Sequence, residues 1–325
     1  MSNLLPYRGS QLIKQEQNPL DPSVPRHLRS KFLWLPDNAR SMGIHIMAGK
    51  GSGKSRLLGR LLCWLDFIRG VPLVILDPNG PSIDNFLDKL TRLPPAYQKQ
   101  LWKRIIYVDM SGRGGHVVSF PLYYRLGEES LYEISQRYLD VVRKTDPWLA
   151  TASVEGWNAL WRIGTYVGII LAALGYQITE VEHLLHSPEA WSNLLAQVAR
   201  THPDAAPAAQ FFTYQYMGWD ERTRARRIDS FINKTAIFNL DPAMKAMFGV
   251  SIPGIDWHKV IEGGYAVLLD FRHEYDLERR RFKMLWAFNY FMDFIKQHEA
   301  GHRHKPMSLM IDELVNHFFI RRAPL

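Results

Sequence analysis

A glycine-rich loop between two apolar segments is the feature that most restricts how this chain can fold. The loop spans residues 48–55 and reads AGKGSGKS; it follows a short strand-like run at 43–47 and opens a helix-like pattern at 54–69. Glycine adopts backbone conformations that are closed to other residues, so this composition favours a tight turn between strand and helix. A strand, a tight loop and a helix in this order are typical of a parallel sheet covered by helices.

The same loop matches the Walker A pattern, with Ala48 in the place of the usual first glycine. In this pattern the backbone N–H groups surround phosphate oxygens, the lysine places a cation on the β- and γ-phosphates, and the next hydroxyl binds Mg²⁺. Lys54 and Ser55 occupy the last two positions, at the start of a helix whose dipole favours phosphate binding. We therefore expect ATP and Mg²⁺ as ligands. The expected nucleotide-binding residues are Ala48, Gly49, Lys50, Gly51, Ser52, Gly53, Lys54, Ser55 and Arg56.

A pair of adjacent carboxylates, Asp312 and Glu313, follows a hydrophobic strand-like run near the end of the chain. In P-loop ATPases such an aspartate holds Mg²⁺ through water, and the glutamate polarises the attacking water. We predict that Asp312 binds Mg²⁺ together with Ser55, and that Glu313 and Lys54 are catalytic.

Two other aspartates also end apolar strand-like runs, and either could be the metal-binding carboxylate instead. These are Asp77, in 71–77, and Asp270, in 265–270. The Asp-Pro-Asn-Gly sequence that starts at Asp77 is typical of a turn, so a structural role is the alternative there.

The alternation of strand-like and helix-like segments predicts an α/β fold with a mainly parallel sheet. A further strand is expected at 105–108, and a long amphipathic helix at 277–298. Residues 128–247 show only helical periodicity, which indicates an all-helical insertion. The expected division is a lead-in segment at 1–40, a core in two parts at 41–127 and 251–325, and the helical insertion at 128–250.

An excess of basic residues, 40 Lys and Arg against 32 Asp and Glu, gives a net charge of +8 and favours an anionic partner such as DNA. Two dense basic clusters could contact a phosphate backbone, or could be solvated helix faces with salt bridges. The first cluster consists of Arg222, Arg224, Arg226 and Arg227, and the second of Arg279, Arg280 and Arg281.

A competing motif at His298–His302 matches the HExxH signature of zinc peptidases. Zinc binding needs both histidines on one face of an uninterrupted helix, and Gly301 and the nearby Pro306 favour a helix end inside the motif. We interpret this segment as a linker from helix to strand.

The chain has one cysteine, Cys63, in an apolar run that predicts a core position. Its longest apolar run, at 163–176, is shorter than the roughly 20 residues that cross a bilayer. No signal-peptide pattern begins the chain. We therefore expect a soluble, cytoplasmic protein with no membrane segment of its own, which partners or missing segments could hold at the inner face of a membrane.

Together these segments resemble the HerA/FtsK superfamily of DNA-pumping ATPases, and most of all the conjugative coupling proteins of type IV secretion (the TraG/TraD group). Besides the two nucleotide motifs, the resemblance rests on the turn at 76–80, on 107–109 followed by the Phe-Pro-Leu at 120–122, and on 238–242. It covers about residues 40–320 and implies a RecA-like core, a hexameric ring around DNA, ATP between subunits, and secretion-channel or relaxosome proteins as partners.

The chain departs from this family after Glu313. Family members continue with further strands, a polar sensor and an arginine that acts on the neighbouring subunit's γ-phosphate, whereas this chain ends at Leu325. We therefore expect a truncated core. A secretion ATPase that moves protein and a nucleotide-binding scaffold without turnover are the alternative functions.

Overall fold

The computed structural model describes residues 46, 51–145, 154–299 and 307–313. The chain divides into two compact units, Met1–Lys54 and Ser55–Leu325. The strand expected at 43–47 lies outside the described residues apart from Ile46, which is half-buried and not in a strand. In the described part of the glycine-rich loop, Gly51 and Gly53 have φ of 82° and 88°. Residues other than glycine rarely adopt these values, which explains why glycine stands at positions 51 and 53.

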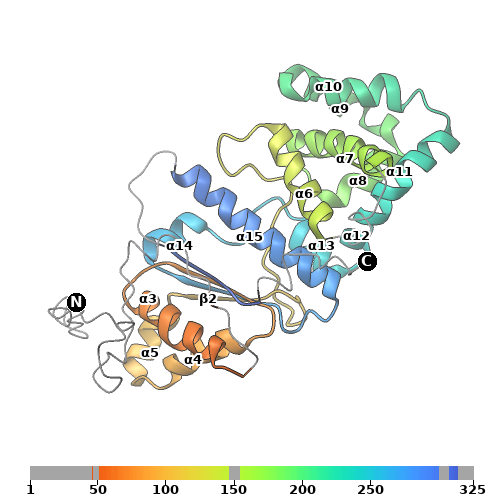
Figure 1. The fold of residues 1–325 in the computed structure, drawn as a ribbon. Helices are drawn as coiled ribbons and strands as arrows, with labels where there is room; N and C mark the ends of the chain where they lie inside the picture. The colour runs from red at the N-terminus through yellow and green to blue at the C-terminus, as the bar shows by residue number, and fades with distance from the viewer. Residues whose placement is uncertain (1–45, 47–50, 146–153, 300–306, 314–325) are drawn as a thin grey trace, which may run out of the picture. The chain divides into compact units, whose positions relative to one another are not determined.

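A sheet of four parallel strands in the order β2-β3-β1-β4 forms the centre of the second unit (Figure 1). The strands are β1 Leu73–Asp77, β2 Ile105–Asp109, β3 Ala266–Asp270 and β4 Ser308–Ile311. All four lie where the apolar runs predicted them. The described structure is therefore mixed α/β with a parallel sheet, as expected.

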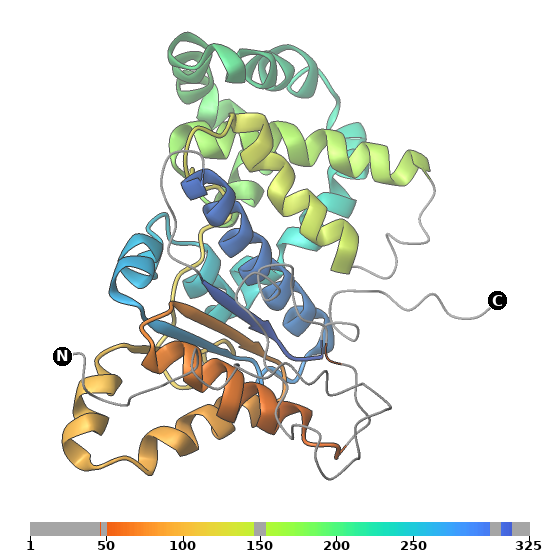
Figure 2. The same cartoon turned by 60° about the vertical axis from the view of Figure 1, so that its left-hand side comes forward.

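One face of this sheet is covered by the helices that follow the glycine-rich loop and β1. The predicted helix over 54–69 is present, but its middle turn is wound as a π-helix. Side chains of Leu73 and Ile75 in β1 pack here against Cys63, which is buried as predicted. In Figure 2 these helices lie below the strands. They are α2 Lys54–Leu57, η1 Leu58–Cys63, α3 Trp64–Ile68, α4 Pro81–Thr91 and α5 Pro95–Trp102.

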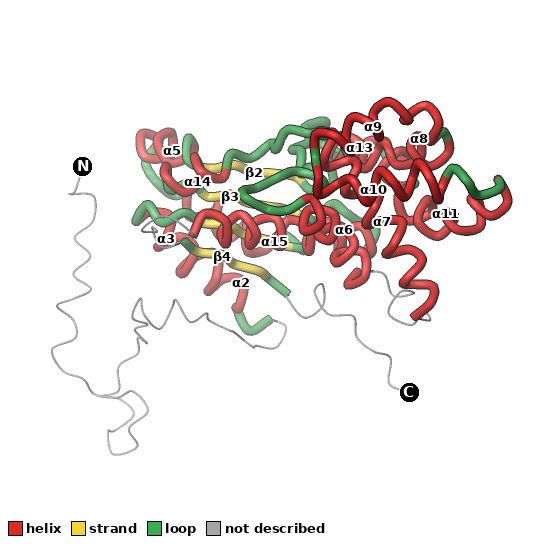
Figure 3. The backbone as a smooth tube through the Cα atoms, turned by 90° about the horizontal axis from the view of Figure 1, so that it is seen from above, coloured by secondary structure: helices red, strands yellow, loops and turns green. Residues whose placement is uncertain are grey.

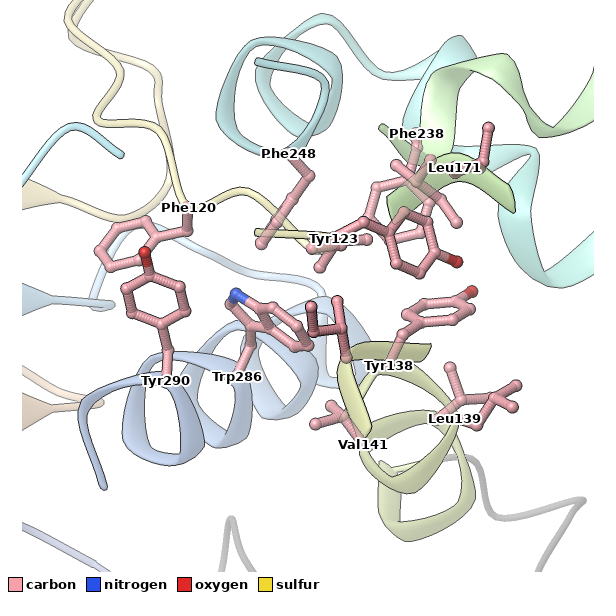
Figure 4. Close-up of a cluster of buried hydrophobic side chains, with 14 of the residues drawn as sticks. Phe120, Tyr123, Tyr138, Leu139, Val141, Leu171, Phe238, Phe248, Trp286 and Tyr290 are labelled. Carbon is pink, nitrogen blue, oxygen red and sulfur yellow. The ribbon is translucent and has the colours of Figure 1, made fainter. Parts of the chain in front are cut away.

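The opposite face of the sheet packs against the long helix α15, Leu277–Glu299, which confirms the helix predicted at 277–298. Val74 and Leu76, the alternate residues of β1, join the hydrophobic core on this side. Figure 4 shows part of that core, where aromatic rings from α15 meet rings from the helical region. The rings of Phe282 and Trp286 stack with their centroids 6.3 Å apart. One continuous core thus joins the sheet to the helices beyond α15.

The helical region expected from residues 128–247 contains only helices in its described part, to one side of the sheet (Figure 3). Its longest helix, α7, carries the longest apolar run, yet no described helix is long and apolar enough to cross a membrane. The elements between β2 and β3 are α6 Leu131–Thr145, α7 Val154–Leu174, η2 Ile178–Glu180, α8 Val181–His186, η3 Pro188–Trp191, α9 Ser192–Thr201, η4 Pro203–Ala205, α10 Ala206–Gln210, η5 Phe211–Tyr216, α11 Glu221–Thr235, α12 Ile237–Leu240, α13 Pro242–Phe248 and α14 Trp257–Gly263.

Candidate functional site

Each of the four described strands ends at, or is followed by, an aspartate at the same edge of the sheet. Asp77, Asp109 and Asp270 end β1, β2 and β3 and are paired in register across the three strands. Asp312 follows β4, and its N–H donates to the Leu76 carbonyl of β1 at 3.0 Å. Open parallel sheets bind ligands beyond the carboxyl ends of their strands. These four carboxylates are therefore the candidates for a ligand-binding site, and they differ in their hydrogen-bond partners.

Asp77 holds the turn that begins α4. Its Oδ1 accepts the N–H groups of Asn79 and Gly80, at 3.0 and 2.8 Å. Its Oδ2 accepts those of Ser82 and Ile83, at 2.7 and 3.1 Å. Burial of the side chain, which is 0% exposed, raises the pKa of Asp77, while these N–H groups oppose the rise. With both oxygens bound to backbone, the residue has the structural role that its turn sequence indicated.

Asp270 forms an ion pair with an arginine, which balances its charge. Its Oδ2 accepts from the Arg272 Nε at 2.7 Å and from the Tyr107 hydroxyl at 2.9 Å. Burial, and next the hydrogen bond to Asp270, raise the pKa of Tyr107 to about 12. Arg272 also binds Asp84 of α4, with 2.7 Å between Nη2 and Oδ1. These contacts tie β3 to α4 and make Asp270 a poor choice for the metal-binding carboxylate.

Asp312 accepts hydrogen bonds from two hydroxyl groups. Ser55 Oγ lies 2.9 Å and Ser82 Oγ 2.8 Å from its Oδ2, while the Glu313 N–H donates to Oδ1 at 3.0 Å. Asp312 is only 4% exposed. The structure thus brings together Ser55 and Asp312, the two residues predicted to bind the metal, although 257 positions separate them in the sequence.

A carboxylate beside hydroxyl groups is a set of hard oxygen donors, which suits Mg²⁺. Within the described ranges there is no group of three or more His, Cys, Asp or Glu side chains that could hold a metal. The described oxygen donors for a cation at this place include the Ser55 hydroxyl and the Asp312 carboxylate. Mg²⁺ usually binds through one or two carboxylates, substrate phosphates and several waters. The residues present fit the expected ion.

Glu313, the predicted catalytic carboxylate, has an unusual backbone conformation. Its φ of 55° lies in the left-handed region, which a non-glycine residue adopts only at a cost in energy. Residues held in such conformations are concentrated at functional sites. The side chain is half-buried and directly follows Asp312.

The predicted nucleotide-binding residues are described from Gly51 onward. Lys54 is half-buried at the first position of α2, and Ser52 and Arg56 are exposed. Ala48, Gly49 and Lys50 lie outside the described residues.

Ser82 is the site residue that the sequence interpretation missed. It lies in the first turn of α4, and its carbonyl faces Gly59 in η1 so closely that a Cβ on Gly59 would lie 2.2 Å from the oxygen. Glycine at this position therefore allows η1 and α4 to approach each other. The position of Ser82, directly after the turn that ends β1, is the signal that could have identified it.

The two basic clusters differ in their contacts. On α11, Arg222, Arg226 and Arg227 are exposed, whereas Arg224 pairs with Glu189 at 3.2 Å. The Arg227 guanidinium lies over the Trp219 ring, 4.4 Å from its centroid.

In the second cluster, at the start of α15, the arginines are half-buried and bound to neighbours. Arg279 pairs with Asp241 at 2.5 Å, and Arg280 Nε donates to the Glu274 carbonyl at 2.8 Å. The salt-bridged interpretation of the second cluster therefore agrees better with the structure, and the first cluster is the better candidate for phosphate contacts.

Only the first two residues of the HExxH motif, His298 and Glu299, lie within a described helix. Helix α15 extends to Glu299, and residues 300–306, which include the second histidine of the motif, lie outside the described residues.

A pocket of about 360 Å³ lies near the carboxyl ends of β2 and β3, away from Asp312, and is lined by residues that include Arg113, Asp241, Glu274 and Arg279. Its acids are already paired, because Asp241 binds Arg279 and Glu274 binds the buried Lys283 at 2.6 Å. We therefore do not assign the nucleotide to this pocket.

No protein-family model, curated protein or solved structure matches the chain. The functional assignment accordingly depends on the residues themselves and on the geometry around Asp312.

Proposed function

We propose that this chain is a P-loop ATPase with a RecA-like core, which binds ATP with Mg²⁺ and hydrolyses ATP to move DNA. The observation that carries the proposal is the 2.9 Å hydrogen bond between Ser55 and Asp312. It joins the hydroxyl of the Walker A pattern to the carboxylate of the second motif. If the two motif matches had arisen by chance, we would not expect their predicted metal-binding residues to form a hydrogen bond.

Each residue then has a role that its chemistry allows. Lys54 places its cation on the β- and γ-phosphates, and Ser55 and Asp312 hold Mg²⁺, which neutralises phosphate charge when it is bound. Glu313 accepts a proton from the attacking water as the bond between the γ-phosphorus and the leaving oxygen breaks, which gives ADP and phosphate. Glu313 directly follows Asp312 in the chain, and its N–H donates to Asp312 Oδ1 at 3.0 Å.

DNA is the proposed track because exposed arginines line the solvent-facing side of α11. Arg222, Arg226 and Arg227 can each contact a phosphate, and the chain carries a net charge of +8. The family resemblance adds the expectation of a homo-hexameric ring. Protein secretion, or nucleotide binding without turnover, are the alternatives that the experiments must separate from this proposal.

The first test is ATP hydrolysis with and without single- and double-stranded DNA. We expect DNA to raise the rate and Lys54→Ala to abolish it. We expect Glu313→Gln to lower kcat by about 10²–10⁴-fold, because it removes the general base but leaves nucleotide binding intact. Glu128→Gln, at an exposed position, is the matched control. ATP binding without turnover on any DNA would indicate a scaffold instead.

The second test measures DNA affinity as a function of salt concentration. Replacing Arg222, Arg226 and Arg227 by alanine should lower the slope of log K against log salt by about 2–3, because each lost phosphate contact releases roughly one counterion fewer. The control is the triple alanine variant of three exposed basic residues near α4 and α5, which causes an equal change in charge. These residues are Arg92, Lys99 and Lys103. Equal slopes in both variants would argue against α11 as the DNA-binding surface.

A further inference from the structure

A buried chain of hydrogen bonds connects the turn after β1 to the proposed metal site. Asp77 accepts the Ser82 N–H at 2.7 Å, and Ser82 Oγ in turn donates to Asp312 Oδ2 at 2.8 Å. Ser55 donates to the same oxygen. Asp77 and Ser82 are both 0% exposed, so water does not compete for the two hydrogen bonds that Ser82 makes.

We propose that Ser82 is a positioning residue, which orients the Asp312 carboxylate toward Ser55 and thereby sets the affinity of the site for Mg²⁺. This inference rests on the proposed function, because it assumes that Ser55 and Asp312 hold the ion. Ser82 belongs to neither nucleotide motif and is 230 positions from Asp312 in the sequence.

Ser82 is held in place from both sides of its backbone. Its N–H is bound to Asp77, and its carbonyl is in close contact with Gly59. Helix α4 is also anchored two residues further on, where Asp84 binds Arg272. A hydroxyl held on a rigid element can impose an orientation on its partner, whereas a mobile one cannot.

Asp312, in contrast, needs a partner that fixes the orientation of its carboxylate. It follows β4 at the edge of the sheet, and a carboxylate can rotate about its χ2 angle at little cost. Hydrogen bonds from Ser55 and Ser82 to Oδ2, and from the Glu313 N–H to Oδ1, distinguish the two oxygens and select one orientation. Ser55 is also expected to bind the ion, whereas Ser82 is a side-chain donor that contacts Asp312 without being an expected ligand of the ion.

Groups that orient a metal ligand typically contribute 10–100-fold to metal affinity. We therefore expect Ser82→Ala to weaken Mg²⁺ binding 10–100-fold without changing nucleotide affinity in the absence of metal. Ser82→Cys keeps the size of the side chain but donates only weakly, so it should behave like Ser82→Ala. Ser82→Thr keeps the hydroxyl and should restore binding toward the wild-type value. Ser135→Ala removes another fully buried serine hydroxyl, far from the site on α6, and serves as the control.

The experiment is an equilibrium titration that does not depend on turnover. The fluorescence of a methylanthraniloyl ATP analogue reports nucleotide binding, first in excess EDTA and then with increasing free Mg²⁺. Manganese binding, followed by the loss of the free-ion paramagnetic resonance signal in the presence of ATP, gives a second readout. Urea unfolding confirms that each variant is folded.

Two results would overturn the inference. One is an Mg²⁺ dependence in Ser82→Ala and Ser82→Cys that stays within twofold of the wild type. The other is an equal loss of nucleotide affinity with and without metal, which would indicate a general structural role. Wild-type protein that shows no metal-dependent nucleotide binding at all would instead refute the proposed function, so the two failures can be distinguished.

Discussion

Replacing Asp77 with asparagine removes half of the acceptors that hold the turn between β1 and α4. The two carboxylate oxygens of Asp77 accept four backbone N–H groups, and the side chain is fully buried. Asparagine keeps one oxygen and turns an NH₂ group toward the other two donors. Each buried N–H that loses its acceptor costs about 1–3 kcal/mol, which gives about 2–6 kcal/mol for the pair.

A second effect acts in the opposite direction. Burial raises the pKa of Asp77 even though four N–H groups favour the charged form, so the charge itself is held at a cost. A neutral amide avoids that cost. We therefore expect the net loss in the free energy of unfolding to lie in the lower part of the range, at about 2–4 kcal/mol.

The assay is urea unfolding, followed by tryptophan fluorescence and by circular dichroism. The matched control is Asp109→Asn, at the end of the neighbouring strand β2. Its Oδ1 accepts the N–H of Ser111 at 2.9 Å, and an asparagine oxygen can take that place. We expect the control to lose less than about 1 kcal/mol. If Asp77→Asn were no more destabilising than Asp109→Asn, the four N–H contacts would not hold the turn as argued.

Three further predictions concern other parts of the fold. Gln177→Leu should lower the free energy of unfolding by about 2–5 kcal/mol in urea, because its buried Oε1 accepts two backbone N–H groups that would lose their partner. Gly59→Ala should force η1 away from the Ser82 carbonyl, lowering the melting temperature and weakening metal-dependent nucleotide binding, whereas Gly114→Ala, whose added Cβ would make only an ordinary contact at 3.8 Å, should change neither. Because the pKa of Tyr107 is raised to about 12 in the folded state, against about 10 when unfolded, the stability that its proton contributes is present below pH 10 and is lost as pH rises toward 12. The free energy of unfolding, measured between pH 10 and 12, should therefore fall less steeply with pH in Tyr107→Phe than in the wild type. Equal slopes in the two proteins would contradict the raised pKa of Tyr107.

The sequence predicted the local features of this protein, because they depend on short-range chemistry. Apolar runs of strand length placed all four described strands, and helical periodicity placed α15 and the helical region. The glycines at 51 and 53 predicted a backbone that only glycine adopts easily. The Asp-Pro-Asn-Gly sequence after Asp77 predicted a turn, which the aspartate itself holds together.

Only the tertiary structure shows what each of the strand-end aspartates contacts. Asp77, Asp270 and Asp312 all follow apolar runs, and the turn sequence after Asp77 and the glutamate after Asp312 favoured Asp312 without excluding the other two. Their contacts distinguish them, since Asp77 binds backbone N–H groups, Asp270 binds an arginine and Asp312 binds two hydroxyl groups.

Ser82 is a second residue whose contacts could not be predicted from its local sequence. Its partner Asp312 is 230 positions away, and the two meet because β1 and β4 are neighbours in the sheet. Strand order depends on how whole helices and strands pack into one core, and no short window of sequence contains that information. The sequence by itself therefore determined the glycine-rich loop, the strands and the carboxylate pair, while the fold determined which oxygen atoms surround Asp312.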